Sequence, residues 1–149
     1  MYWLELSVKV FTIVGGAIAI LTFWRTVKIR RAEWLSSLHA KFFEGSSYTR
    51  VRRILDSGET DRELAQLRNE LGADQNSELA EEFVNYLNFF EFVASLRKFG
   101  QIRQAEIAML FDYYLRLLCK HEFVRTYVRK NGFEELDALL RECVERRSK

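Results

Sequence analysis

Three polar side chains interrupt the most apolar stretch of this sequence, at intervals of three residues. They are Asn85, Asn88 and Glu91, and aromatic or aliphatic residues surround each of them. On a helix, steps of three residues drift slowly around one side, so the three side chains lie near one another. Buried polar groups need hydrogen-bond partners, and an arginine near position 50 is a candidate partner for Glu91. The pattern predicts a buried polar network, which either stabilises the fold or lines a pocket for a small ligand.

The motifs of enzymes and metal sites are missing from the sequence. The two histidines, His39 and His121, have no zinc-ligand spacing, and the helical Glu-x-x-His pairs of a di-metal carboxylate site are absent. The two cysteines, Cys119 and Cys143, have neither a metal-ligand partner nor the context of a nucleophile, so we expect reduced thiols. We therefore predict no enzyme activity, no cofactor and no metal site.

Charged residues are segregated along the sequence, although the formal net charge is only +2. Acids dominate between positions 56 and 82, and bases cluster elsewhere. The basic clusters are Arg50, Arg52 and Arg53; Arg125, Arg129 and Lys130; and Arg141, Arg146, Arg147 and Lys149. Such clusters are either solvated helix faces or contacts to the phosphate of a lipid, a nucleotide or RNA. We take Arg50, Arg52 and Arg53 as the candidate site for an anionic ligand such as a nucleotide, and the small net charge predicts no DNA partner.

An uncharged, mostly apolar run over residues 10–24 is the strongest signal in the sequence. Counted from residue 2, the segment forms a helix of roughly 35 Å, enough to cross a hydrocarbon core of about 30 Å. Glu5 and Lys9 fall within it at a spacing that lets them pair, and Lys9 can snorkel to the interface. We predict a transmembrane anchor over residues 1–24. The competing interpretations are a signal peptide cleaved near Ala17-Ile18-Ala19 and a buried core helix of a soluble protein.

Positive charge follows the apolar run directly. Arg25, Lys28, Arg30 and Arg31 all come before the next acidic residue. By the positive-inside rule, the C-terminal domain lies in the cytoplasm, and the N-terminus lies outside the inner (plasma) membrane. The same four side chains are predicted to contact the phosphates of membrane lipids.

Small residues lie together within the apolar run. Gly15 and Ala19 are four positions apart, and Gly16 lies beside them. Small side chains allow two helix backbones to approach closely in lipid. We therefore expect this face to pack against another helix, in a homo-oligomer or in a larger membrane complex.

The rest of the sequence predicts helices almost throughout, in agreement with the complete absence of proline. Residues 25–45 continue the anchor as a juxtamembrane helix without a linker, and Gly45 ends it. Residues 46–149 form a cytoplasmic helical domain, with helices expected at 48–55, 61–71, 78–99, 102–122, 123–130 and 133–146. The expected N-caps are Ser46, Ser47, Thr60 and Ser77. The predicted fold is all-α: one N-terminal transmembrane helix continuing into an irregular cytoplasmic helical bundle.

Two short stretches of the sequence carry a resemblance. One runs from Ala32-Glu33-Trp34-Leu35 to Phe42-Phe43-Glu44, and the other, Leu87 to Glu91, precedes Arg97, Lys98 and Gly100. Together with the apolar anchor and its basic flank, this layout resembles a family of small bacterial single-pass membrane proteins with a helical cytoplasmic domain of unknown function. The resemblance covers most of the chain. It implies a membrane location and a helical domain, and it implies no catalytic residue.

The sequence therefore favours a non-enzymatic, membrane-anchored interaction module, either a small subunit or an adaptor. The features behind this prediction are the helix that runs on from the anchor, the small-residue face and the missing catalytic motifs. The second hypothesis is a membrane-anchored sensor-effector. In that case the cytoplasmic domain binds a phosphate-bearing nucleotide signal, and the chain perturbs the membrane in stress or antiviral defence.

Overall fold

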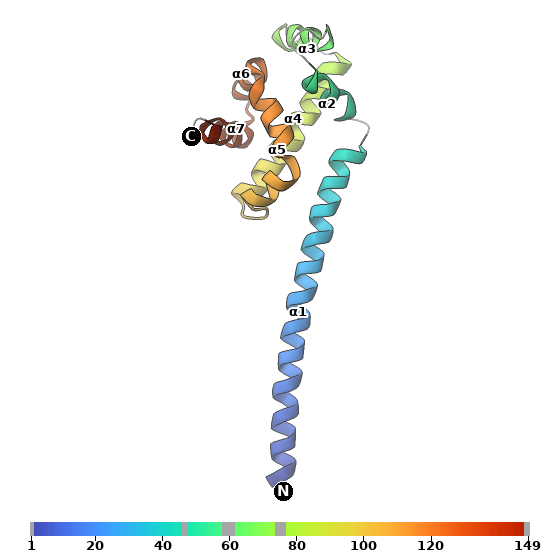
Figure 1. The fold of residues 1–149 in the computed structure, drawn as a ribbon, viewed down its shortest axis with the longest axis vertical. Coiled ribbons are helices and arrows are strands. Elements are labelled where there is room, and N and C mark those ends of the chain that lie inside the picture. Colours follow the sequence, from blue (N-terminus) through green and yellow to red (C-terminus); the bar gives the residue numbers. More distant parts are fainter. Residues whose placement is uncertain (1, 46–47, 58–61, 74–76, 148–149) are drawn as a thin grey trace. The chain divides into compact units, whose positions relative to one another are not determined.

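The computed structural model describes residues 2–45, 48–57, 62–73 and 77–147, with side chains described from residue 14 to residue 145 (Figure 1). These residues form helices and no strand. The helices are α1 (Tyr2–Glu44), α2 (Thr49–Asp56), α3 (Arg62–Gly72), α4 (Glu78–Lys98), α5 (Gln104–Lys120), α6 (Glu122–Lys130) and α7 (Glu134–Arg147). The prediction of an all-α fold is confirmed.

The chain divides into two compact units, residues 1–42 and residues 43–149. The first unit holds all but the last two residues of α1, which is one unbroken helix of 43 residues from Tyr2 to Glu44. Gly45 lies just beyond the end of the helix. The predicted continuation of the N-terminal helix through residues 25–44 is therefore confirmed.

The side chains of α1 are exposed on every face from Val14 to Arg30. The hydroxyls of Thr22 and Thr26 donate hydrogen bonds to the carbonyl oxygens of Ile18 (2.8 Å) and Thr22 (2.9 Å), so both hydroxyls are satisfied within the helix. Within the described residues, no helix combines the length and the apolarity that crossing a membrane requires. The transmembrane anchor over residues 1–24 thus stays a prediction.

The second unit is built around α4, most of whose apolar side chains are buried while Asn85, Asn88 and Phe92 lie on its exposed face. Phe83, Phe90 and Val93 of this helix are each 0% exposed. α7 packs against α4, α5 and α6, while α2 packs against α4 and α5 (Figure 1). Phe111 of α5 meets Phe89 and Phe90 edge-on, at centroid distances of 5.5 and 5.9 Å. The prediction that this segment forms the buried core helix is confirmed.

Helix ends follow the signals in the sequence closely. The hydroxyl of Ser77 accepts a hydrogen bond from the Ala80 N–H (3.0 Å) and caps α4 as predicted. Gly100 and Gly132 follow α4 and α6 with φ angles of 69° and 79°, a conformation that residues with side chains rarely adopt. The caps predicted at Ser46, Ser47 and Thr60 lie outside the described residues.

Candidate functional site

The polar residues of α4 do not form the buried network that the sequence predicted. Asn85 and Asn88 are exposed, and Glu91 is half-buried. Steps of three residues retreat by about 60° each around a helix, so the three positions cover about 120°. Only Glu91 reaches the edge of the buried face, and the other two point into solvent. The prediction of a buried network at Asn85, Asn88 and Glu91 is therefore wrong.

Glu91 instead binds the start of α7. Its carboxylate accepts hydrogen bonds from the backbone N–H groups of Leu136 (2.7 Å) and Glu135 (3.2 Å). The N–H groups in the first turn of a helix have no partner within the helix, and the positive end of the helix dipole favours a carboxylate there. Glu91 therefore has a structural role as a cap that joins α4 to α7.

Two cations at the end of α4 strengthen the same contact. Arg97 donates two hydrogen bonds to the carboxylate of Glu142, at 2.7 and 2.5 Å, and Lys98 pairs with Glu135. The hydrogen bond to its carboxylate partner raises the pKa of Arg97, and the same cause raises the pKa of Lys98. Arg97 and Lys98 of α4 thus both bind carboxylates of α7.

The arginines of α2, predicted to bind an anion, are engaged with neighbouring groups. Arg53 pairs with Glu63 of α3 at 3.0 Å. Arg50 lies 3.7 Å from carboxylate oxygens of both Glu63 and Glu82. Arg52 donates a hydrogen bond to the carbonyl oxygen of Phe43 (3.3 Å) and lies over its ring. Because carboxylates neutralise two of the three charges, anion binding by Arg50, Arg52 and Arg53 stays a prediction with less electrostatic support.

The candidate contact residues of α1 lie on an open helix surface. Arg25, Lys28 and Arg30 are exposed and Arg31 is half-buried. A Cβ atom added at Gly15 or Gly16 would meet nothing within 4 Å, and Ala19 is exposed. This face of α1 can accept another helix or lipid, and both roles remain predictions.

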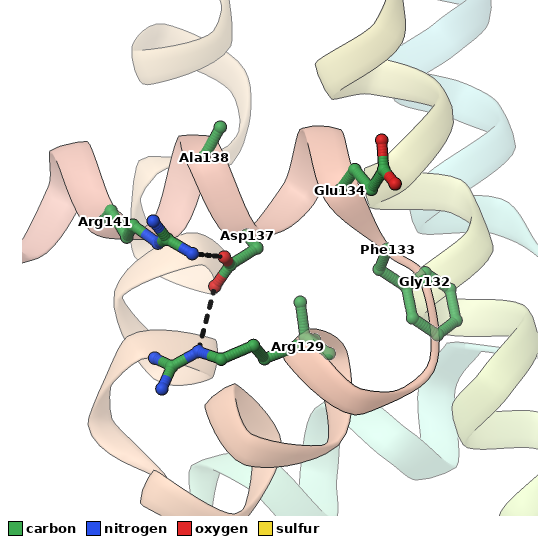
Figure 2. A pocket seen from close by; sticks show the side chains of 8 residues that line it. Arg129, Gly132, Phe133, Glu134, Asp137, Ala138 and Arg141 are labelled. Atoms are coloured by element: carbon green, nitrogen blue, oxygen red, sulfur yellow. Dashed lines mark hydrogen bonds and ion pairs between the residues drawn. The ribbon is translucent and has the colours of Figure 1, made fainter.

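A pocket of about 470 Å³ lies between α6 and α7, with a smaller one of about 240 Å³ beside it. Figure 2 shows Arg129 of α6 and Arg141 of α7 directed at the carboxylate of Asp137. Arg141 forms an ion pair with Asp137, and the Arg129 Nε atom lies 3.9 Å from its other oxygen. Asp137 itself is only 9% exposed. The charges at this site are largely satisfied internally.

A larger pocket of about 860 Å³ lies on another side of α6, where α3 and the junction of α5 with α6 form its walls. Four cations line it, Arg68, Lys120, Arg125 and Lys130, against a single carboxylate, Glu122. Among the described residues, none of the four cations forms an ion pair with a carboxylate. We call these four side chains the α6 cation cluster. Its chemistry suits the binding of an anion.

In the second unit, His121 and Cys119 form hydrogen bonds to backbone carbonyls. His121, which is 3% exposed, places Nε2 3.0 Å from the carbonyl oxygen of Leu55, and a carbonyl only accepts, so Nε2 carries the proton. Cys119 and Cys143 are free thiols, and Cys119 donates to the Leu140 carbonyl. In the described part of the chain, no group of His, Cys, Asp and Glu is arranged to hold a metal ion.

Comparison with known proteins adds no relative. No protein-family model, no curated protein and no solved structure matches this chain. The resemblance to the family of small bacterial membrane proteins therefore stays a prediction, and function has to be argued from the residues themselves.

Proposed function

We propose that this chain is a non-enzymatic, membrane-anchored interaction module, in which α1 holds the helical domain at the cytoplasmic face of a membrane. One observation carries the proposal: the uncharged turns of α1 display large apolar side chains all around the helix. Ile18, Leu21 and Phe23, for example, are 59%, 69% and 65% exposed. A helix that is apolar on every side needs an apolar environment to cover it. The uncharged run covers residues 10–24, and the structure describes its side chains from Val14 onward.

Polar groups within and after the run agree with a lipid environment. The hydroxyls of Thr22 and Thr26 are bonded to the backbone of α1, so they place no unsatisfied group among the acyl chains. The exposed cations Arg25, Lys28 and Arg30 follow directly, at the level expected for lipid phosphates. These features support an N-terminus outside the membrane and a domain on the cytoplasmic side.

The domain also offers surface for a protein partner. Phe99 and Met109 are each 73% exposed, and Phe92 is 51% exposed. Large apolar side chains on a surface are common features of protein interfaces, where aromatic residues and methionine are enriched. They support the role of a small subunit or adaptor, alongside the assembly through Gly15, Gly16 and Ala19 proposed for α1.

Membrane fractionation tests the anchor. In a bacterial host, the full-length chain is expected to stay in the membrane pellet after an alkaline carbonate wash. Val14→Lys combined with Ile18→Lys should release it, because a charge near the centre of a span costs about 2.5–3.5 kcal/mol. Ala32→Lys, which adds a charge to an exposed position beyond the run, is the control and should stay in the pellet. Release of the wild-type chain by carbonate would refute the anchor.

The second candidate is a sensor-effector that binds a phosphate-bearing signal. One observation favours it: the α6 cation cluster surrounds a pocket and has no carboxylate partners among the described residues. An adaptor needs no such pocket. The two candidates differ in whether a small ligand binds to the helical domain, and that difference can be measured.

A further inference from the structure

We propose that the pocket lined by the α6 cation cluster binds the phosphate group of a small molecule of nucleotide size. The pocket belongs wholly to residues 43–149, so the inference does not depend on the proposed anchoring of α1. It also moves the predicted phosphate contact from the arginines of α2 to side chains contributed by α3, α5 and α6.

Charge is the first argument. Arg68 comes from α3, Lys120 from the end of α5, and Arg125 and Lys130 from α6, and all four line one pocket with Glu122 as the single acid. Four cations around one pocket with a single acid give it a positive potential, which attracts an anion. By contrast, Arg53, Arg97 and Arg141 of the same unit each have a carboxylate partner.

The geometry of two arginines is the second argument. The guanidinium carbon of Arg68 lies 5.4 Å from the centre of the Phe123 ring. A guanidinium that stacks on a ring keeps the N–H groups at its edge available, and that edge matches two phosphate oxygens. Arg125 has its Nε atom buried, with no hydrogen-bond acceptor among the described residues. This atom has almost no accessible surface, so the terminal N–H groups of the Arg125 guanidinium are the donors that an anion in the pocket can reach.

Size identifies the class of ligand. A pocket of about 860 Å³ falls within the range of roughly 300–1,000 Å³ that is typical of small-molecule sites. Inorganic phosphate alone would leave most of this volume unfilled. Thr126 and Asn131 also line the pocket; the Asn131 amide donates to the Tyr127 carbonyl (2.9 Å), which leaves its Oδ1 atom and the Thr126 hydroxyl to hydrogen-bond to the remainder of a phosphate ester. A nucleotide, with one charged group and a polar body, has the matching composition.

Calorimetric titration of the full-length chain in a mild detergent tests the proposal. The probes are adenosine 5′-monophosphate, adenosine and inorganic phosphate, at constant ionic strength. The nucleotide and phosphate are expected to bind, and adenosine is not. Lys120→Gln combined with Lys130→Gln should weaken nucleotide binding by about tenfold or more, because two cations that attract the ligand's phosphate are removed.

Two further variants separate binding from folding. Lys120 and Lys130 lie in the last turns of their helices, where a cation also stabilises the helix dipole. Arg68→Ala changes the middle of α3 instead, and it should weaken binding to a similar extent with unchanged helix content by circular dichroism. Arg116→Gln is the control, because Arg116 pairs with Asp112 at 3.1 Å and does not line the pocket. The control should bind as the wild type does.

A lipid headgroup carries the same phosphate chemistry, and vesicles distinguish the two sources. If the nucleotide gives no heat but Lys120→Gln/Lys130→Gln loses binding to vesicles of anionic phospholipid, the phosphate site is supported and its ligand is a headgroup. If neither the nucleotide nor inorganic phosphate gives heat, and the double variant binds vesicles as the wild type does, the proposal is overturned. Equal affinity for adenosine and its monophosphate would also overturn it.

Discussion

The two sides of α6 use the same residue types in opposite ways. Toward α7, Arg129 and Arg141 share the carboxylate of Asp137, which is only 9% exposed, so both cations face a carboxylate. Toward α3 and α5, the α6 cation cluster has no carboxylate partner among the described residues. Only the acid of this group is buried, and removing its charge leaves two arginines without a carboxylate partner. Cations that lack such a pair contribute little to holding helices together, which leaves them available to a ligand.

The largest expected effect comes from breaking the paired side. Asp137→Asn keeps the shape of the side chain and removes its charge, so both arginines lose their partner. We expect a loss of about 1–2 kcal/mol in the free energy of unfolding, less than for a fully buried pair because the arginines face water. Urea unfolding followed by circular dichroism measures it. Nucleotide binding on the other side of α6 should be unchanged.

A matched variant shows whether burial of the acid is the cause. Asp112→Asn removes the partner of Arg116 at the surface of α5, where both side chains are at least half exposed. Its effect should stay within about 0.5 kcal/mol. Equal losses from the Asp112 and Asp137 variants would contradict the view that the α6–α7 pair has a special structural role.

Between α4 and α7, the carboxylate of Glu91 is bound by backbone N–H groups, without a cation. Glu91→Gln keeps a hydrogen-bond acceptor at the start of α7 but removes the charge that favours the helix dipole. We expect a loss of about 0.5–1 kcal/mol in the free energy of unfolding. Asn88→Gln, one turn away on the same helix, should change it by less than about 0.5 kcal/mol because Asn88 is exposed. Similar losses in both variants would restore the idea of a shared polar network.

The sequence predicted the helices better than it predicted the contacts between them. Caps such as Ser77 and glycines such as Gly100 act locally, so a local pattern was enough to place the ends of α4. The sequence predicted that one helix ends at residue 122, whereas α5 ends at Lys120 and His121 separates it from α6. The ring of His121 binds the Leu55 carbonyl, a tertiary contact that a local pattern does not show. Which way Asn85 faces depends on where the neighbouring helices pack, and periodicity carries no information about that.

The α6 cation cluster was only partly visible in the sequence for a similar reason. Arg125 and Lys130 lie close together along the chain and form part of a basic cluster there. Arg68 lies in a segment dominated by acids, and Lys120 lies outside every basic cluster of the sequence. Folding brings Arg68 of α3 to the stretch from Lys120 to Lys130, which supplies the other three residues of the pocket. A cluster assembled across helices leaves no signature in the spacing of residues along one helix.

The smallest expected effect tests a contact between α3 and α4 in which hydrogen bonds, more than the nearby charge of Arg50, hold a carboxylate. Hydrogen bonds from Ser77 (2.5 Å) and Gln66 (2.7 Å) lower the pKa of Glu70 from its ordinary value of 4.5. Because the pKa is lower in the folded state, the stabilisation is complete above the unfolded pKa and is lost as the pH falls through the folded one. Thermal unfolding at a series of pH values should therefore show a steeper decline on acidification for the wild type than for Glu70→Gln. Parallel curves would mean that these hydrogen bonds hold the neutral carboxyl of Glu70 as well as its carboxylate, so that its ionisation contributes nothing to stability.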